Sequence, residues 1–141
     1  MFIEPGQGEV ADLGVAAMRL LVGAEQTRGA LGVAEFSGKP GAWTVPHQHN
    51  GLEECFYVLR GRFAFESGAE QFEAAPGTFV MVPRGTRHVL AAVTEDASLL
   101  VLWTPGGLEQ MFLELSRLEP GSLTDPTARA EVSRKYDSVP T

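Results

Sequence analysis

Short runs in which apolar and polar residues alternate fill most of the chain, and turn residues separate them. Residues 54–60 and 62–66 alternate with a period of two, whereas 78–82 is almost continuously apolar. Alternation places successive side chains on opposite faces of a β-strand. Short strands punctuated by Gly and Pro predict an all-β sandwich or barrel, not a parallel α/β sheet. The other predicted strands are 15–22, 30–36, 43–49, 71–74, 88–93 and 99–103.

The period changes after Pro105-Gly106-Gly107. A helix is predicted there, because apolar residues recur along one helical face while Glu109 and Glu114 fall mostly on the opposite face. The apolar positions of this stripe are Leu108, Met111, Phe112, Leu115 and Leu118.

A second C-terminal helix is predicted from its start signals. Thr124 or Asp125 can cap it, and Pro126 suits its first position. This helix would run to about residue 136, and residues 1–10, with several breakers, are expected to be irregular. We therefore expect one domain over 1–141, with a barrel core at about 15–104 and a helical segment at about 107–136.

Composition and charge limit the partners and the cellular compartment that suit the protein. The chain has 141 residues, a net charge of −7 and only 11 scattered basic residues, which argues against nucleic acid or an anionic membrane as a partner. The single cysteine, Cys55, excludes an internal disulfide framework and favours a reducing cytoplasm. Glu4, Pro5 and Glu9 make the start unlike a signal peptide, and no apolar run approaches the ~20 residues that span a bilayer.

The chain contains three histidines, and their placement indicates a metal site. His47 and His49 are one residue apart, so a strand would point both imidazoles to the same side. His88 follows in the later stretch 77–92. Imidazoles gathered on one face are a natural start for a transition-metal site. The alternative is that the two histidines only pack against their neighbours and bind no metal.

Two spaced motifs resemble those of the cupin family. The first is a glycine, His-x-His, a glutamate and a glycine, and the second is a glycine, Pro-x-Gly and a histidine. Together they cover about a third of the chain. Ala92 stands where the second motif has an asparagine, which is the one departure. The matching residues are Gly41, His47, His49, Glu54, Gly61, Gly77, Pro83, Gly85 and His88.

The resemblance implies a cupin β-barrel, a double-stranded β-helix of the jelly-roll type, with one or two C-terminal helices here. It also implies that His47, His49, Glu54 and His88 bind one divalent transition metal ion. Iron, manganese, nickel, copper and zinc all suit three imidazoles and a carboxylate. Glu54 is preferred to Glu53, because it lies six residues before Gly61 and its neighbour would face the other way. A cupin without metal is the alternative.

Apolar residues on the predicted inner face could line a substrate pocket above the ion, fit for an aromatic molecule. Ordinary core packing is the alternative for most of them. The pocket candidates are Trp43, Val45, Phe56, Phe65, Leu90 and Ala92.

The layout resembles that of single-domain relatives of quercetin dioxygenase. That resemblance implies a dioxygenase acting on an enolic or phenolic aromatic small molecule, with Glu54 as ligand and as possible base for the substrate hydroxyl. A non-redox isomerase, decarboxylase or cyclase, or a binding protein without catalysis, remains open because cupins host many chemistries. A homodimer is expected, with the strand at 15–22 as its contact.

Overall fold

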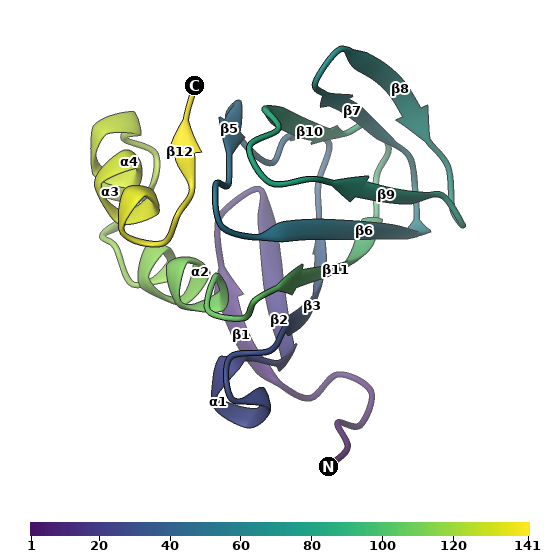
Figure 1. Ribbon diagram of the computed structural model, residues 1–141. Coiled ribbons are helices and arrows are strands. Elements are labelled where there is room, and N and C mark those ends of the chain that lie inside the picture. The colour runs from purple at the N-terminus through teal and green to yellow at the C-terminus, as the bar shows by residue number, and fades with distance from the viewer.

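A computed structural model describes residues 1–141 and contains two antiparallel sheets flanked by C-terminal helices (Figure 1). The first sheet has the strand order β1-β2-β3-β11-β6-β9. Its strands are β1 (Glu9–Asp12), β2 (Ala16–Val22), β3 (Gly32–Gly38), β6 (Glu53–Arg60), β9 (Phe79–Val82) and β11 (Ala97–Thr104).

The second sheet has the order β12-β5-β10-β7-β8, with β4 pairing with β10 beside β5. Strands distant in sequence thus meet in both sheets, as expected for a jelly-roll type of barrel. The strands of this sheet are β4 (Gly41–Ala42), β5 (His47–Gln48), β7 (Phe63–Ser67), β8 (Glu70–Ala74), β10 (His88–Ala92) and β12 (Val139–Pro140).

Four helices complete the chain, and three of them follow the last long strand. A short α1 (Ala24–Thr27) connects β2 and β3. The later helices are α2 (Glu109–Ser116), α3 (Pro120–Leu123) and α4 (Pro126–Lys135), which gather at one side of the sheets (Figure 1). The Asp125 carboxylate accepts a bond from the Thr127 N–H and Pro126 follows it, so the predicted cap of α4 is confirmed.

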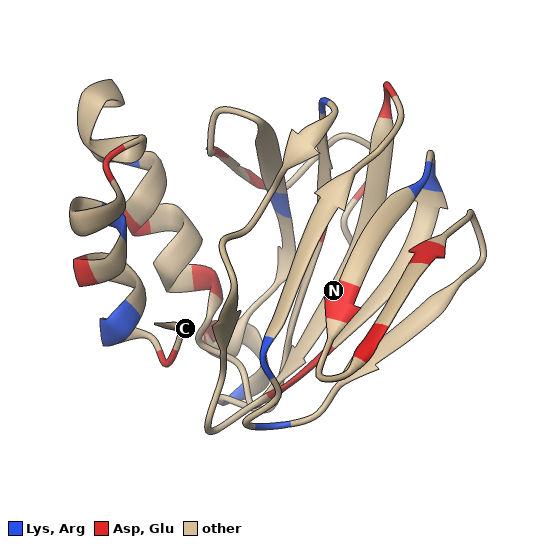
Figure 2. Ribbon diagram, turned by 90° about the horizontal axis from the view of Figure 1, so that it is seen from above, with Lys and Arg blue, Asp and Glu red and all other residues tan.

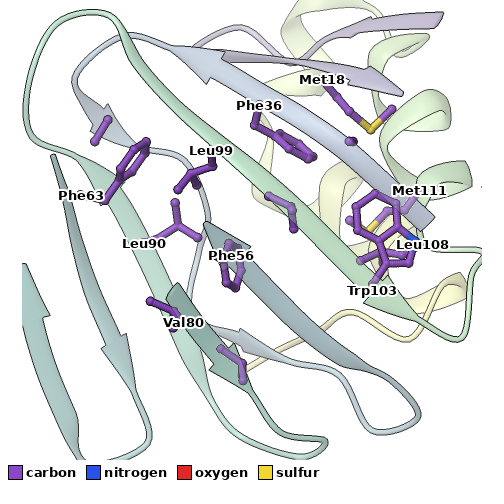
Figure 3. Close-up of a cluster of buried hydrophobic side chains, with 14 of the residues drawn as sticks. Met18, Phe36, Phe56, Phe63, Val80, Leu90, Leu99, Trp103, Leu108 and Met111 are labelled. Carbon is purple, nitrogen blue, oxygen red and sulfur yellow. The ribbon is translucent and has the colours of Figure 1, made fainter. Parts of the chain in front are cut away.

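One continuous hydrophobic core joins both sheets and α2 (Figure 3). Inward residues alternate along β11, where Leu99, Val101 and Trp103 are buried. The Phe112 ring of α2 lies 5.0 Å from the Phe36 ring, centroid to centroid, so the helix covers a part of the first sheet. The predicted apolar stripe of this helix therefore packs against the barrel rather than forming a separate lid.

One prediction at the N-terminus of the chain needs correction. Residues 1–10 are not wholly irregular, because β1 begins at Glu9 and pairs with β2. Only Ala11 of this strand is buried and the apolar Val10 is exposed, so the alternation is weak. Since β1 and β3 flank β2, neither edge of the strand at 15–22 is open to a second copy of the chain.

Of the predicted strand at 43–49, only His47–Gln48 forms a strand, β5, and the short β4 lies just before this stretch. Pro46 lacks an N–H and cannot extend a ladder, and the N–H groups of Trp43 and Thr44 both point to the Leu90 carbonyl, at 3.2 and 3.4 Å. The irregular turn exposes the Val45 side chain by 56%, so its predicted position on the barrel interior is wrong.

Glu109 was predicted on the polar face of its helix but is buried, with 1% exposure. Its carboxylate accepts bonds from the Gly107 N–H, at 2.8 and 2.9 Å, and from the Ala24 N–H, at 3.1 Å. A buried carboxylate is tolerated where backbone donors satisfy it. Glu109 thus joins α1 to the start of α2, a role that helical periodicity does not reveal.

Candidate metal centre

His47, His49, Glu54 and His88 converge at one buried point. Their candidate ligand atoms all lie within 4.8 Å of one another. His47 begins β5 and pairs in register with His88, which begins β10, while Glu54 comes from β6 of the other sheet. The second sheet therefore supplies His47 and His88, the residue position just after β5 supplies His49, and the first sheet supplies the carboxylate.

Turns at the end of the barrel bring the two sequence motifs together. The Gly85 N–H donates to the His49 carbonyl at 2.6 Å. Gly85 has φ of +75°, a conformation that glycine adopts without a steric penalty. The turn before β10 is thereby tied to the segment that holds His47 and His49.

Each histidine ring is oriented by a backbone carbonyl. A carbonyl can only accept, so Nδ1–H is the donor in all three cases. His47 donates to Val45 at 2.7 Å and His88 donates to Thr86 at 2.9 Å. His49 donates to Asp137 at 2.8 Å. Such partners fix the tautomer of a metal-binding histidine and leave Nε2 for the ion.

Glu54 lies against two of the imidazoles. Its Oε1 is 3.1 Å from His88 Nε2 and 3.3 Å from His49 Nε2. Burial raises the pKa of the Glu54 carboxyl, but the interactions with His49 and then His88 outweigh burial and hold this pKa well below its usual range. Glu54 is therefore a carboxylate at neutral pH, as a metal ligand must be.

The imidazoles have unlike electrostatic surroundings. Burial, reinforced by the electrostatic effect of the neighbouring His88, lowers the pKa of His47 to about 4, so the His47 ring is neutral at pH 7. Burial also lowers the pKa of His49, but the Glu54 carboxylate outweighs it and the net pKa is raised. His47 is thus already in the protonation state that a metal ligand requires.

These residues fit a first-row transition metal ion. His49 Nε2 is buried without an aligned hydrogen-bond partner, and an unsatisfied buried nitrogen is unfavourable unless something binds it. Three imidazoles and one carboxylate are the donors that such ions take. An ion at the convergence point would satisfy this nitrogen.

Glu53 and Glu54 differ as the alternation predicts. Glu54 is 5% exposed and faces the histidines. Glu53 is half-buried and pairs with Arg84 at the surface. Of the two, only Glu54 can reach an ion held by the histidines.

The predicted pocket residues separate into two groups. Phe56, Phe65, Leu90 and Ala92 are buried in the common core, and Phe56 lies 6.5 Å from His88 between ring centroids. Trp43 is half-buried against Phe63, whereas Val45 is exposed. Two surface cavities, of about 190 and 250 Å³, are lined by other residues. An aromatic-binding pocket beside the centre therefore stays a prediction.

Sequence reasoning missed Asp137. It follows α4 and precedes β12, and no motif includes it. Only the fold brings its carbonyl to His49.

Comparison with known proteins identifies the family. The model of the cupin domain family matches residues 35–105, half of the chain, which includes both motifs. The chain belongs to the cupin domain family.

One curated relative has a named activity. The chain is 26% identical to quercetin 2,3-dioxygenase of Bacillus subtilis (strain 168) over 113 residues, which are 80% of this chain. The match spans 34% of that longer protein.

Solved structures share the fold at low identity. KdgF from Halomonas sp. has a TM-score of 0.69 at 20% identity, over 78% of this chain and 97% of that chain. Pac13 of Streptomyces, a nucleoside dehydratase, has a TM-score of 0.64 at 15% identity, over 78% of this chain and 86% of that chain. The predicted cupin β-barrel is confirmed.

The distribution of basic residues and the lengths of the helices are in line with the inferences drawn from composition. Basic residues are scattered over strands, loops and helices (Figure 2). None of the helices has the length and hydropathy that crossing a membrane would require.

Proposed function

We propose that this protein is a metal-dependent cupin enzyme that binds one divalent transition metal ion through His47, His49, Glu54 and His88. The observation that carries the proposal is the buried convergence of these four side chains, with each imidazole oriented by a carbonyl on its far side. Iron, manganese, nickel, copper and zinc all suit this donor set.

The reaction that we propose is dioxygenation of an enolic or phenolic aromatic small molecule. Similarity to quercetin 2,3-dioxygenase over 80% of the chain supports this choice. When bound, the ion would supply a Lewis acid with one or two positions free for external ligands. Phe56, whose ring lies near His88 in an edge arrangement, would offer an apolar wall to an aromatic substrate.

Glu54 would have two tasks in this reaction. Its ionised carboxylate would help to hold the ion and would accept the proton of the substrate hydroxyl. The barrel core would exclude water around it, since Glu54 is 5% exposed. Proton acceptance by Glu54 is the part of the proposal that a conservative substitution can test.

A non-redox reaction is the second candidate. Its support is the fold shared with a nucleoside dehydratase, at 15% identity. An isomerase, decarboxylase or cyclase would use the same ligands without consuming oxygen. A protein that only binds metal or a small ligand is the third candidate.

Metal analysis followed by a substrate screen tests these candidates. Protein made in cells should contain about one transition metal ion per chain. Flavonols and other enolisable aromatics would then be supplied with air and without oxygen, with oxygen uptake and products measured. Uptake coupled to product formation supports the dioxygenase. Products formed equally without oxygen contradict it and support the second candidate.

The predicted partners are a small-molecule substrate and a second copy of the chain. Sedimentation at micromolar concentration tests the homodimer, and a monomer would contradict it. Because the edges of β2 are occupied, only its outward side chains could take part in such a contact.

A further inference from the structure

The ring of His49 is oriented by a residue from the far end of the chain. Its Nδ1–H donates to the carbonyl of Asp137, 88 positions away in sequence. His47 and His88 instead donate to carbonyls two positions before them. The hydrogen bond to the His49 ring therefore comes from the C-terminal segment, whereas those to the other two rings come from their own loops.

Asp137 also binds the turn that follows His49. Its Oδ1 accepts from the Asn50 N–H at 2.9 Å and its Oδ2 accepts from the Gly51 N–H at 2.6 Å. One residue thus contacts both the ring and the adjoining main chain of a candidate ligand. These bonds restrain the imidazole from two sides.

Asp137 is itself held on both sides. The Ser138 N–H donates to the Ser133 carbonyl at 3.1 Å, which joins it to the end of α4. Beyond it, β12 pairs with β5, the strand that contains His47, and the Thr141 N–H donates to the Pro46 carbonyl at 3.0 Å. In Figure 1, β12 lies between α4 and β5.

The backbone at Asp137 has φ of +60°, in the left-handed region. Few side chains adopt this conformation, and aspartate and asparagine are among those that do. In this position the carbonyl and the carboxylate both meet the segment 49–51.

We propose that Asp137 is a positioning residue of the metal centre, through which the C-terminal segment fixes His49 and retains the ion. This inference rests on the proposed metal centre. The matched family region ends at residue 105, so this support comes from outside it. Outer partners of metal ligands typically change metal affinity by about 10- to 100-fold.

The first experiment compares two aspartates of like conformation. Asp137→Gly removes the carboxylate and keeps a residue suited to positive φ. Asp96→Gly is the matched control, because Asp96 has φ of +52° and its side chain only pairs with Arg60 at the surface, at 3.4 Å. The full-length proteins would be loaded with Co²⁺ and mixed with excess chelator. We expect release about 10-fold faster from Asp137→Gly and unchanged from the control.

The second experiment observes the ring without metal. Imidazole ¹⁵N–¹H spectra of the metal-free protein report the Nδ1–H of each histidine. Asp137→Gly keeps the main-chain carbonyl to which His49 donates but removes the carboxylate bonds to Asn50 and Gly51 that hold this carbonyl against the ring. It should therefore speed exchange of the His49 Nδ1–H and leave those of His47 and His88 protected. Asp137→Asn tolerates the same backbone and keeps one acceptor, so it should restore part of the protection. A purely structural defect would affect all three rings.

Gly51→Ala perturbs the contact between Asp137 and the turn by changing the turn instead of Asp137. A Cβ at Gly51 would lie 3.2 Å from Asp137 Oδ2, which would force the carboxylate to shift. We expect faster Co²⁺ release than in wild type, by less than in Asp137→Gly.

The outcomes separate this inference from the proposed function. If wild type binds no Co²⁺, the metal centre is wrong, and the retention role of Asp137 is wrong with it. If wild type binds Co²⁺ but Asp137→Gly and Asp96→Gly release it at the same rate, the inference is overturned and the metal centre stands. Faster release with selective loss of His49 protection supports the inference.

Discussion

The barrel and the C-terminal segment contribute to the same site in different ways. The barrel supplies all four candidate ligands and orients two of the imidazoles through carbonyls in their own loops. The segment after residue 107 supplies no ligand, yet it orients the third imidazole. All four candidate ligands therefore come from the barrel that defines the family. The orientation of one of them, His49, also requires the C-terminal segment.

The two regions also differ in packing. Strand β11 crosses the core and buries residues along most of its length, whereas α4 buries only Val132. Local opening is easier where little apolar surface is buried. The site therefore joins a firmly packed barrel to a more weakly packed segment.

The largest expected effect is on the barrel ligands. His47→Ala combined with His49→Ala should abolish metal binding and leave the barrel folded, because two of the four ligands are removed. The matched control is Gln48→Ala on the same strand, whose side chain contacts Asn50. Metal content by elemental analysis and folding by circular dichroism measure the result. Full metal occupancy in the double variant would show that the ion lies elsewhere.

The next effect concerns the two adjacent glutamates of β6. Glu54→Gln, measured at saturating metal, should lose about 100- to 10,000-fold in turnover if Glu54 accepts the substrate proton. Glu53→Gln should change little, because its carboxylate pairs with Arg84 away from the histidines. Equal losses would mean that the glutamates are wrongly assigned. Full turnover by metal-loaded Glu54→Gln would show that Glu54 is not the base. Its role as a metal ligand would remain compatible with that result.

A stability comparison tests the packing of the barrel. Phe65 is buried between Phe56, at 5.3 Å, and Phe72, at 5.4 Å between ring centroids. Phe65→Ala should lower the free energy of unfolding by about 3–5 kcal/mol, because it removes core contacts and leaves a cavity. Phe79→Ala, at a side chain 61% exposed, should change it by about 0.5 kcal/mol or less. Urea unfolding measures both, and similar losses would contradict the assignment of inner and outer faces.

The smallest effect is a difference in local opening. Amide hydrogens of α4 should exchange faster than those of β11, since α4 is held by few buried side chains. Hydrogen exchange followed by NMR would measure the two protection levels in one sample. Equal protection would show that the C-terminal segment and the barrel open together, and the contrast drawn above would then fail.

Sequence periodicity determined much of the barrel, and the resemblance to the two cupin motifs identified the candidate ligands. The alternation in β6 separates Glu54 from Glu53, and the spacing of His47 and His49 places both on the buried side. The cap at Asp125 with Pro126 also marked the start of α4 correctly. These features depend on residues within a few positions of one another, which is the range over which strand and helix periods act.

Only the tertiary structure decided the remaining features. The burial of Glu109 depends on backbone donors at Gly107 and Ala24, and the exposure of Val45 follows from a turn that Pro46 imposes. The hydrogen bond from His49 to Asp137 joins residues 88 positions apart. Periodicity shows which way a side chain points along its own element. Which distant backbone group meets it depends on how the whole chain packs, so the ligands could be predicted from the sequence and the support of His49 could not.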